Sequence, residues 1–550
     1  MPDLIVAVRL LRSGGDQQHS MPVEGGAMTI RQMAVMTVVL AILLGSVGCF
    51  SGDADVRHFV FSNGGEPETI DPGLVTGSPG ITIINQIFEG LTSLDPQTLE
   101  PKPGAAERWD ISDDALVYTF HLRPTAAWSD GQPLTAHDFD FAWRRVLDPA
   151  TGARYADQLY VIAGAEARHR GDSDADLGIT VLDDHRLEVR LHAPCAYFLE
   201  LTAFATFMPV PRQAITAQAE RWTFDQPPSN GPFMIERWSV GERMVMVPNP
   251  HYWDRDAVRL ERITALPIDN HDTAYQRFIA GAIDWMNTVP AGKMDEAQRH
   301  PGFYTHPFLA SYYFRVNVTR PPLDDVRVRQ ALSQAIDRGH ITRHVTGLGE
   351  IPATWYCPQM GDYQPPPGLG YDPEAARAAL AAAGFGPDGQ AFPALTLLYN
   401  NSDMHQRIAE AIVQQWEENL GIVITLRNAE WGSYMASLSN LDYDLARSGW
   451  IGDFHDPITF YHCFVSSGGN NRTGWSDDEY DALLREAGTS PDANHRLELF
   501  ARLETILTRE SLPIIPLFIY VNKGLISERV RHFSPNIRDL LFCKYLDIVE

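Results

Sequence analysis

The stretch HQRIAEAIVQQWEENLGIVITLRN, His405–Asn428, indicates the fold class. Its first part, up to Ile422, repeats apolar residues at the spacing of an amphipathic helix, and VITLRN then has the composition of a strand. Other segments show the same two patterns: strands are predicted at VYTFHL, 117–122, and RLEVRLH, 186–192, and capped helices at 372–384 and 477–488. This alternation predicts an α/β or mixed protein. Because the chain has no repeat and no low-complexity linker, we expect interleaved domains.

Composition limits the partners of the chain. Its 550 residues are 44% hydrophobic and 21% charged, which is typical of a globular protein, and the length allows two to four domains. Lys and Arg number 44 against 70 for Asp and Glu, so the formal net charge is −26. Such a charge repels nucleic acids and anionic lipid headgroups, and neither is an expected partner.

The N-terminal residues predict export. MAVMTVVLAILLGSVG, Met33–Gly48, is an apolar run that follows Arg31 and is too short to span a membrane. Cys49 comes directly after small residues, as in a bacterial lipobox. We therefore interpret residues 1–48 as a lipoprotein-type signal peptide, with Met28 as an alternative start, and Cys49 as the lipidated residue. An ordinary signal peptide with an incidental cysteine is the alternative.

The sequence predicts neither catalysis nor a cofactor. It contains no GxSxG, HExxH or phosphate-loop motif, and the i, i+4 pair His340 and His344 has no matching set of carboxylates or thiols for a metal. The exported part keeps four further cysteines, Cys195, Cys357, Cys463 and Cys543. They allow one or two disulfides, whose pairing the sequence does not indicate.

One short stretch carries two opposite charges. DYDLARSGWIGDFHDP, Asp442–Pro457, is interpreted as a strand, a turn broken by glycine, and a polar segment. Arg447 and Asp453 stand at the two ends of the turn. A surface ion pair or a helix cap explains such residues, and so does a site for a ligand that carries both charges.

Seven blocks occur in the order found in one known family. They are NGGEPETIDP (63–72), TFHLRPTAAWSDGQPLTAHDFDFAWRRVLDP (119–149), SNGPFMIERW (229–238), NPHYWD (249–254), PPLDDVRVRQALSQAIDR (321–338), LLYNNSDMH (397–405) and ARSGWIGDFHDP (446–457). Through them the chain resembles the oligopeptide-binding proteins of bacterial ABC importers, the large extracytoplasmic solute-binding family. The resemblance extends from about Phe59 to Leu525.

The resemblance implies an architecture and a role. The expected fold is the two-lobe, type II periplasmic-binding-protein fold with an extra third domain and closure about a hinge. Domain I is expected at 50–78, 212–309 and 520–550, domain II at 79–211 and domain III at 310–519. The implied protein is a lipid-anchored, extracytoplasmic monomer that delivers oligopeptides to ABC permease subunits, touches the membrane only through its lipid, and is not an enzyme.

The resemblance also implies site residues. Asp453 matches the residue that binds the peptide amine, Arg447 the one that binds the carboxylate of a short peptide, and His405 one that meets the carboxylate of a longer peptide. The remaining matches are Glu66 on the first strand along the peptide, Trp431 in a side-chain pocket, Tyr155 near the ligand, and Gly449 and Trp450 in the segment of Asp453. Every free peptide has an ammonium at one end and a carboxylate at the other. A receptor that binds both groups fixes the direction of the peptide, whatever its side chains are.

This chain departs from the family pattern at two places. Ile451 and Ala310 stand where some members have a cysteine pair, and Thr346 lies near the position of a lysine that meets very short peptides. Peptide length and side-chain preference therefore stay open. So do ligands of another kind on the same fold, namely a murein peptide, a signalling peptide, an oligosaccharide or a metal chelate, and an envelope enzyme or chaperone.

Overall fold

The structure, a computed structural model, describes residues 57–549 apart from residues 173, 175, 219–220, 225, 387–388 and 467. The predicted signal peptide and Cys49 lie outside the described residues. Among the helices that are described, none is both long enough and apolar enough to cross a membrane.

An eleven-stranded mixed sheet is the largest element of the fold, in the order β15-β14-β16-β12-β17-β11-β1-β10-β9-β8 with β13 beside β17. Its strands are β1 (His58–Ser62), β8 (Phe233–Ser239), β9 (Arg243–Pro248), β10 (Arg262–Leu266), β11 (Trp285–Met286), β12 (Phe303–Val316), β13 (Ile351–Pro352), β14 (Leu395–Asn400), β15 (Ile424–Ala429), β16 (Leu445–Ile451) and β17 (Ile514–Ile526). Both parallel and antiparallel pairs occur, as in β1–β10 and β12–β16.

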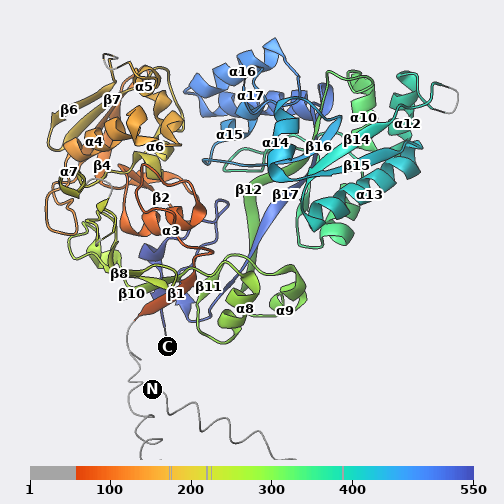
Figure 1. Ribbon diagram of the computed structural model, residues 1–550. Coiled ribbons are helices and arrows are strands. Elements are labelled where there is room, and N and C mark those ends of the chain that lie inside the picture. Colours follow the sequence, from red (N-terminus) through yellow and green to blue (C-terminus); the bar gives the residue numbers. More distant parts are fainter. Residues whose placement is uncertain are drawn as a thin grey trace, which may run out of the picture. The chain divides into compact units, whose positions relative to one another are not determined.

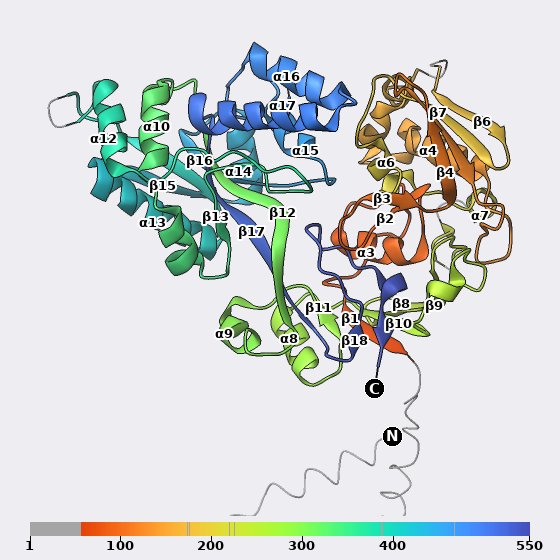
Figure 2. The same ribbon diagram turned by 180° about the vertical axis from the view of Figure 1, so that it is seen from behind.

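Two long antiparallel strands, β12 and β17, join the two halves of this sheet. They lie side by side along most of their length (Figures 1 and 2). Their ladder is interrupted between Pro307 and Ser311, where the register shifts. A proline removes a backbone donor, and a second register shift follows between Tyr312 and Tyr313.

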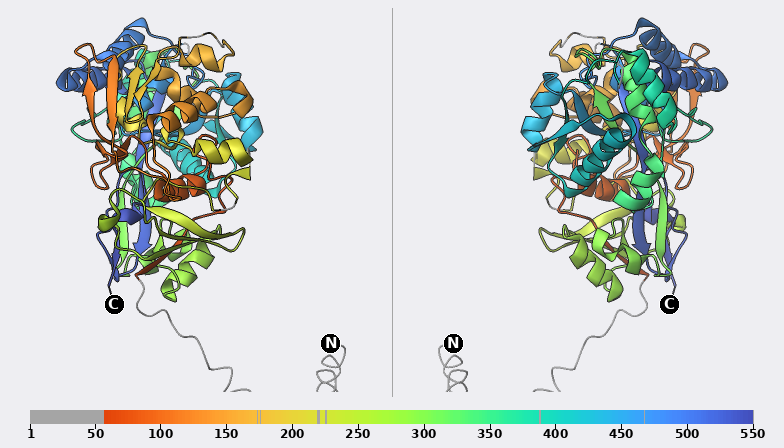
Figure 3. Two further views of the ribbon diagram at one scale, coloured as in Figure 1. Left: turned by 90° about the vertical axis from the view of Figure 1, so that its left-hand side faces the viewer. Right: turned by 90° about the vertical axis from the view of Figure 1, so that its right-hand side faces the viewer.

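A second, antiparallel sheet has the order β4-β5-β7-β6. Its strands are β4 (Ala106–Ile111), β5 (Val117–Leu122), β6 (Ile179–Asp183) and β7 (Arg186–Arg190), and two short hairpins pair β2 (Thr92–Leu94) with β3 (Pro101–Pro103) and β18 (Val530–Arg531) with β19 (Asp547–Ile548). The side views show the C-terminal residues ending near β1 and α8 (Figure 3), and Asp547 is paired there with Arg57 at 3.4 Å.

The helices confirm the α/β interpretation. They are α3 (Ser78–Ile87), α4 (Ala136–Val146), α5 (Ala165–His169), α6 (Phe198–Leu201), α7 (Arg212–Gln218), α8 (His271–Ile279), α9 (Met294–Ala297), α10 (Val326–Gln334), α11 (Arg338–His340), α12 (Pro373–Ala382), α13 (Asp403–Leu420), α14 (Trp431–Ser439), α15 (Ile458–Tyr461), α16 (Asp478–Thr489) and α17 (Ala493–Thr505). The predicted helix at 405–422 is α13, which starts after the N-cap Ser402 and ends at Gly421 with φ +70°. The predicted strands at 117–122 and 186–192 are β5 and β7.

Two expectations need correction. The glycine at 449 does not break the chain into a turn, because β16 continues through it and Gly449 pairs with Tyr312 of β12. The turn starts at Gly452 instead, so Arg447 lies within a strand. The disulfides that the sequence allowed are not formed: Cys195, Cys357, Cys463 and Cys543 are all buried free thiols.

Candidate functional site

Parallel strands bring two predicted residues together. β14 and β16 run parallel, so their carboxyl ends meet at one edge of the sheet, where ligands bind in open α/β sheets. Helix α13 starts just beyond β14 and carries His405 in its first turn, with the imidazole 5.6 Å from the ring of Tyr312. The guanidinium of Arg447, on β16, lies 4.9 Å from the same ring. Tyr312 thus joins Arg447 and His405 in one cluster.

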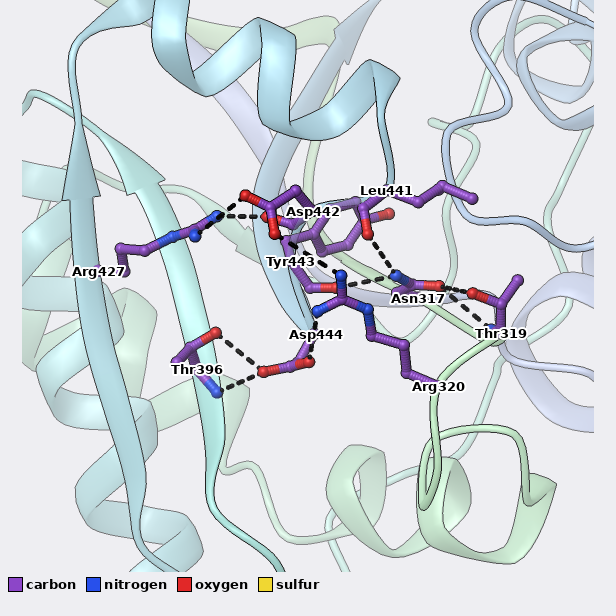
Figure 4. A network of polar contacts seen from close by, with 9 residues as sticks. All are labelled: Asn317, Thr319, Arg320, Thr396, Arg427, Leu441, Asp442, Tyr443 and Asp444. Carbon is purple, nitrogen blue, oxygen red and sulfur yellow. Dashed lines mark hydrogen bonds and ion pairs between the residues drawn. The ribbon is translucent and has the colours of Figure 1, made fainter.

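A polar network holds the start of β16 (Figure 4). The carboxylate of Asp444 accepts hydrogen bonds at 2.9 Å from both the backbone N–H and the hydroxyl of Thr396, and pairs with Arg320 at 3.3 Å. The amide of Asn317 donates to the carbonyls of Leu441 and Tyr443. The strand is therefore anchored on both sides before it reaches Arg447.

Arg447 has no counter-ion among the described residues. Its guanidinium is largely buried and contacts neutral groups only, donating to the Tyr520 hydroxyl at 3.2 Å and to Asn400 Oδ1 at 3.5 Å. Its Nε is buried without any partner. A buried cation is costly unless an anion pairs with it, and a guanidinium offers a planar fork to a carboxylate. This arrangement suits an anionic group of a ligand.

His405 contributes hydrogen bonding rather than charge. Its Nδ1 lies 3.3 Å from the Tyr312 hydroxyl. Burial, and then the nearby charge of Arg447, lower the pKa of His405 to about 3. The imidazole is therefore neutral at ordinary pH, and Arg447 is the cation of this cluster.

Gly449 and Trp450 lie on opposite faces of β16, since side chains alternate along a strand. Gly449 shares the face of Arg447, and a Cβ added to it would lie 3.5 Å from Arg447 Nη2. Trp450 packs on the other face, beside the core that contains Tyr313, and its indole N–H is buried without a partner. Ala310 and Ile451, where some family members have a cysteine pair, are directly opposite each other in the ladder.

Trp431, on α14, contacts the backbone of β16 through its neighbour Tyr434. It is 55% exposed and stacks on Tyr434 with the ring centroids 5.5 Å apart. The Tyr434 hydroxyl donates to the carbonyl of Arg447. Tyr434 packs with Ala446, so these two rings lie on the face of β16 opposite to the Arg447 side chain.

Asp453 lies just beyond the end of β16, six residues after Arg447. Its backbone N–H donates to the Thr459 hydroxyl at 3.1 Å, whereas no described residue donates a hydrogen bond to its half-buried carboxylate. Burial raises the pKa of Asp453, and the charge of Arg538 opposes this shift. Burial, and then the charge of Asp453, raise the pKa of Tyr155, so the two side chains interact electrostatically.

Glu66 is not joined to either end by these contacts. It lies beyond the end of β1, not within the first strand as expected. Its carboxylate accepts hydrogen bonds from the indole of Trp238 at 2.7 Å and from the Gly241 N–H at 3.0 Å, in the β8–β9 hairpin.

Two charged residues near Asp453 were not predicted from the sequence. Arg538, near the C-terminus, donates from Nη2 to the carbonyl of Asp453 at 2.9 Å and pairs with Glu200 of α6 at 3.4 Å. Glu200 also accepts the backbone N–H of His455. Neither residue lies in a motif, and their separation in sequence leaves no signal from which to find them.

Comparisons with known proteins agree with the blocks. The bacterial extracellular solute-binding proteins, family 5 (middle region), match residues 100–472. The chain is 35% identical over 483 residues to the oligopeptide-binding protein OppA of Bacillus subtilis, covering 85% of this chain and 88% of the relative. It is 35% identical over 514 residues to the periplasmic oligopeptide-binding protein OppA of Salmonella typhimurium, covering 90% and 93%.

Solved structures agree with the fold. The periplasmic murein tripeptide-binding protein MppA, in its unliganded open form, gives a TM-score of 0.81 at 34% identity and covers 90% of this chain and 98% of that one. Haemophilus influenzae OppA in complex with RPPGFSPFR gives 0.69 at 31% identity, covering 90% and 99%. The predicted two-lobe, type II periplasmic-binding-protein fold is confirmed. The chain belongs to the bacterial extracellular solute-binding proteins of family 5.

Proposed function

We propose that this protein captures oligopeptides outside the cytoplasm, as a monomer without catalytic activity, and delivers them to the permease subunits of an ABC transporter. The observation that carries the proposal is a pair of unmatched charges on one short segment, Arg447 on β16 and Asp453 just beyond its end. Arg447 has no carboxylate partner, and the Asp453 carboxylate has no donor among the described residues. Every unmodified linear peptide has a carboxylate for the first and an ammonium for the second.

The same two charges explain why the two lobes should close over a ligand. Desolvating each ion without a partner costs on the order of several kcal/mol. A bound peptide supplies both counter-ions, so the closed state becomes favourable only with ligand. We place domain I at 50–78, 212–309 and 520–550, domain II at 79–211 and domain III at 310–519. The two crossings at 309/310 and 519/520 then fall on β12 and β17 beside their register shift, which is the expected hinge.

Calorimetric titration tests the role of Asp453. Wild type and Asp453→Asn are titrated with a tripeptide and with its N-acetyl form. A lost charge-assisted hydrogen bond is worth roughly 1.5–3 kcal/mol, so each single change should weaken binding by about tenfold to a hundredfold. Acetylation should add little to the loss in Asp453→Asn. Additive losses would mean that the ammonium and Asp453 do not meet.

A murein peptide is the second candidate ligand, because the similarity to MppA extends over 90% of this chain. Incubation with a mixed library of peptides and murein peptides, followed by mass spectrometry of the retained molecules, separates the candidates. Intact released peptides support a receptor, and cleaved peptides would indicate an enzyme.

We also propose that acyl chains on Cys49 hold the mature protein at the extracytoplasmic face of a membrane, in keeping with the periplasmic relatives. More than one chain is needed for stable anchoring. Cys49→Ala should release the protein or block its processing. A variant that stays entirely in the membrane fraction with unchanged mobility contradicts the anchor.

A further inference from the structure

Glu200 is a buried carboxylate close to the Asp453 loop. It lies on α6 with 7% of its surface exposed, and accepts the backbone N–H of His455, two residues after Asp453. The ring of Tyr197, on the same segment, stacks on Phe454 with 4.4 Å between centroids and 7° between planes. Residues 197–200 therefore pack directly against the loop that carries Asp453.

Arg538 links Glu200 to the backbone of the Asp453 loop. Its side chain is 12% exposed, donates to the Asp453 carbonyl at 2.9 Å, and pairs with Glu200 at 3.4 Å. Its charge also acts on the carboxylate of Asp453. An ammonium that approaches Asp453 therefore meets a cation nearby.

The other titratable groups near Glu200 and Asp453 are paired, neutral or exposed to solvent. Asp456 is paired with Arg496 at 2.8 Å, and His455 is neutral because burial, and then Arg538, lower its pKa to about 4. Asp157, near Asp453, is exposed to solvent, which screens its charge. The charges of Asp453 and Arg538 alone would sum to zero. A bound ammonium would then add a buried positive charge that no anion balances. With Glu200 ionised, the three charges sum to −1, which matches one ammonium.

We propose that Glu200 is a positioning residue of the ammonium site, which balances Arg538 so that the charge of Asp453 remains for the amine of the ligand. The inference rests on the proposed peptide-binding function. It names a second residue that sets the preference for a free amine, on a segment remote in sequence from the Asp453 block.

The arrangement has a consequence for pH. Burial raises the pKa of Glu200 to about 7, and the charge of Arg538 opposes the shift. Protonation below that pH leaves Arg538 unbalanced, so the preference for a free amine should fall from pH 7.5 to 5.5. The amine of the peptide is more fully protonated at the lower pH, which acts in the opposite direction.

The test is the ratio of the dissociation constants of the N-acetyl and the free tripeptide, by calorimetry. Glu200→Gln keeps an acceptor for the His455 N–H and removes the charge, and the ratio should fall about tenfold. Asp284→Asn is the matched control: Asp284 is also buried, pairs with an arginine of the C-terminal segment, Arg529, at 2.6 Å, and accepts a backbone N–H, from Val60. Its ratio should equal that of wild type.

The double variant Glu200→Gln with Arg538→Gln separates charge balance from structural support. Removing both charges restores the sum of −1, so the ratio should recover most of the lost factor. A purely structural role predicts the lowest ratio of all for the double variant. The pH dependence of the ratio should also be shallower in Glu200→Gln than in wild type.

Three results would overturn the inference: an unchanged ratio in Glu200→Gln, no recovery in the double variant, or the wild-type pH profile retained in Glu200→Gln. Failure of the proposed function is distinct, because wild type itself would then fail to bind the tripeptide or to prefer its free amine. If Glu200→Gln does not fold, the pH dependence of the ratio in wild type tests the proposal. A wild-type ratio that stays the same or rises between pH 7.5 and pH 5.5 contradicts it.

Discussion

The two ends of the proposed site differ in how their charges are compensated. At the Arg447 end, the buried cation is surrounded by neutral partners, Tyr312, Tyr520 and Asn400. At the Asp453 end, a guanidinium, that of Arg538, donates to the Asp453 backbone carbonyl and pairs with a second carboxylate, Glu200. The first end depends on a ligand for all of its charge compensation, whereas the second is already partly compensated.

Because their charges are compensated differently, the two ends should respond differently to mutation and to pH. A lone cation among neutral groups should lose affinity sharply when it is removed, and should be indifferent to pH. A shared network of carboxylates should respond less to any single change and more to pH. Four predictions test this contrast.

The largest effect is expected for Arg447→Gln. Truncating one partner of a buried charge pair costs roughly 2–5 kcal/mol, so a tripeptide with a free carboxylate should bind about a hundredfold more weakly. A C-terminal amide should bind wild type and variant almost equally. Arg427→Gln is the control, since Arg427 is already paired with Asp442 at 3.5 Å. Calorimetric titration gives the constants, and an equal loss for acid and amide contradicts a carboxylate at Arg447.

The next effect concerns Glu504, which resembles Glu200 in burial but lies away from the site. It is fully buried, accepts from the Tyr461 hydroxyl and from the Tyr356 and Cys357 N–H groups, and burial raises its pKa to about 7. A folded pKa above the unfolded value means that the folded state binds more protons between pH 4.5 and 7. The free energy of unfolding should therefore fall as the pH rises, by about 2.5 kcal/mol from pH 5 to 8 through this group.

Glu504→Gln should remove that share of the pH dependence without changing the amine preference, even if it lowers stability at every pH. Urea denaturation of both proteins at pH 5 and pH 8 measures the difference. Parallel pH profiles in variant and wild type would show that Glu504 does not titrate in this range.

A smaller effect is expected for Trp431→Ala. The side chain is 55% exposed and stacks on one ring, so thermal stability should change little. An aromatic pair is worth roughly 0.5–1.5 kcal/mol, so a peptide with an aromatic side chain at the matching position should bind about fivefold more weakly. Comparing Phe and Ala variants of one peptide isolates this term, and equal losses for both would exclude a side-chain contact.

The smallest effect is at His405. Because its pKa is about 3, the affinity difference between a C-terminal acid and its amide should stay constant from pH 5 to 8. A difference that grows below pH 7 would mean that His405 gains a proton when the peptide binds, and the contrast between the two ends would fail.

Local pattern predicted much of this molecule. The helix at 405–422 and the strands at 117–122 and 186–192 were recognisable because burial of one face imposes a period on the sequence. The turn predicted at Gly449 was wrong. Glycine alone favours turns, but here Gly449 pairs with Tyr312 in the β12–β16 ladder, and this pairing outweighs the turn preference of glycine. Glu66 was expected on the first strand and lies beyond it.

The α/β class, the order of blocks that marks the family, and the presence of Arg447, His405 and Asp453 in those blocks could all be predicted from the amino-acid sequence. Which of the charged side chains have partners became visible only in the folded chain. Arg320 and Arg427 are paired with Asp442 and Asp444 while Arg447 is not, and Arg538 reaches both Glu200 and Asp453. The physical reason is that period and propensity act between near neighbours, whereas desolvation and Coulomb energy depend on distances in space, which are set when remote segments pack together.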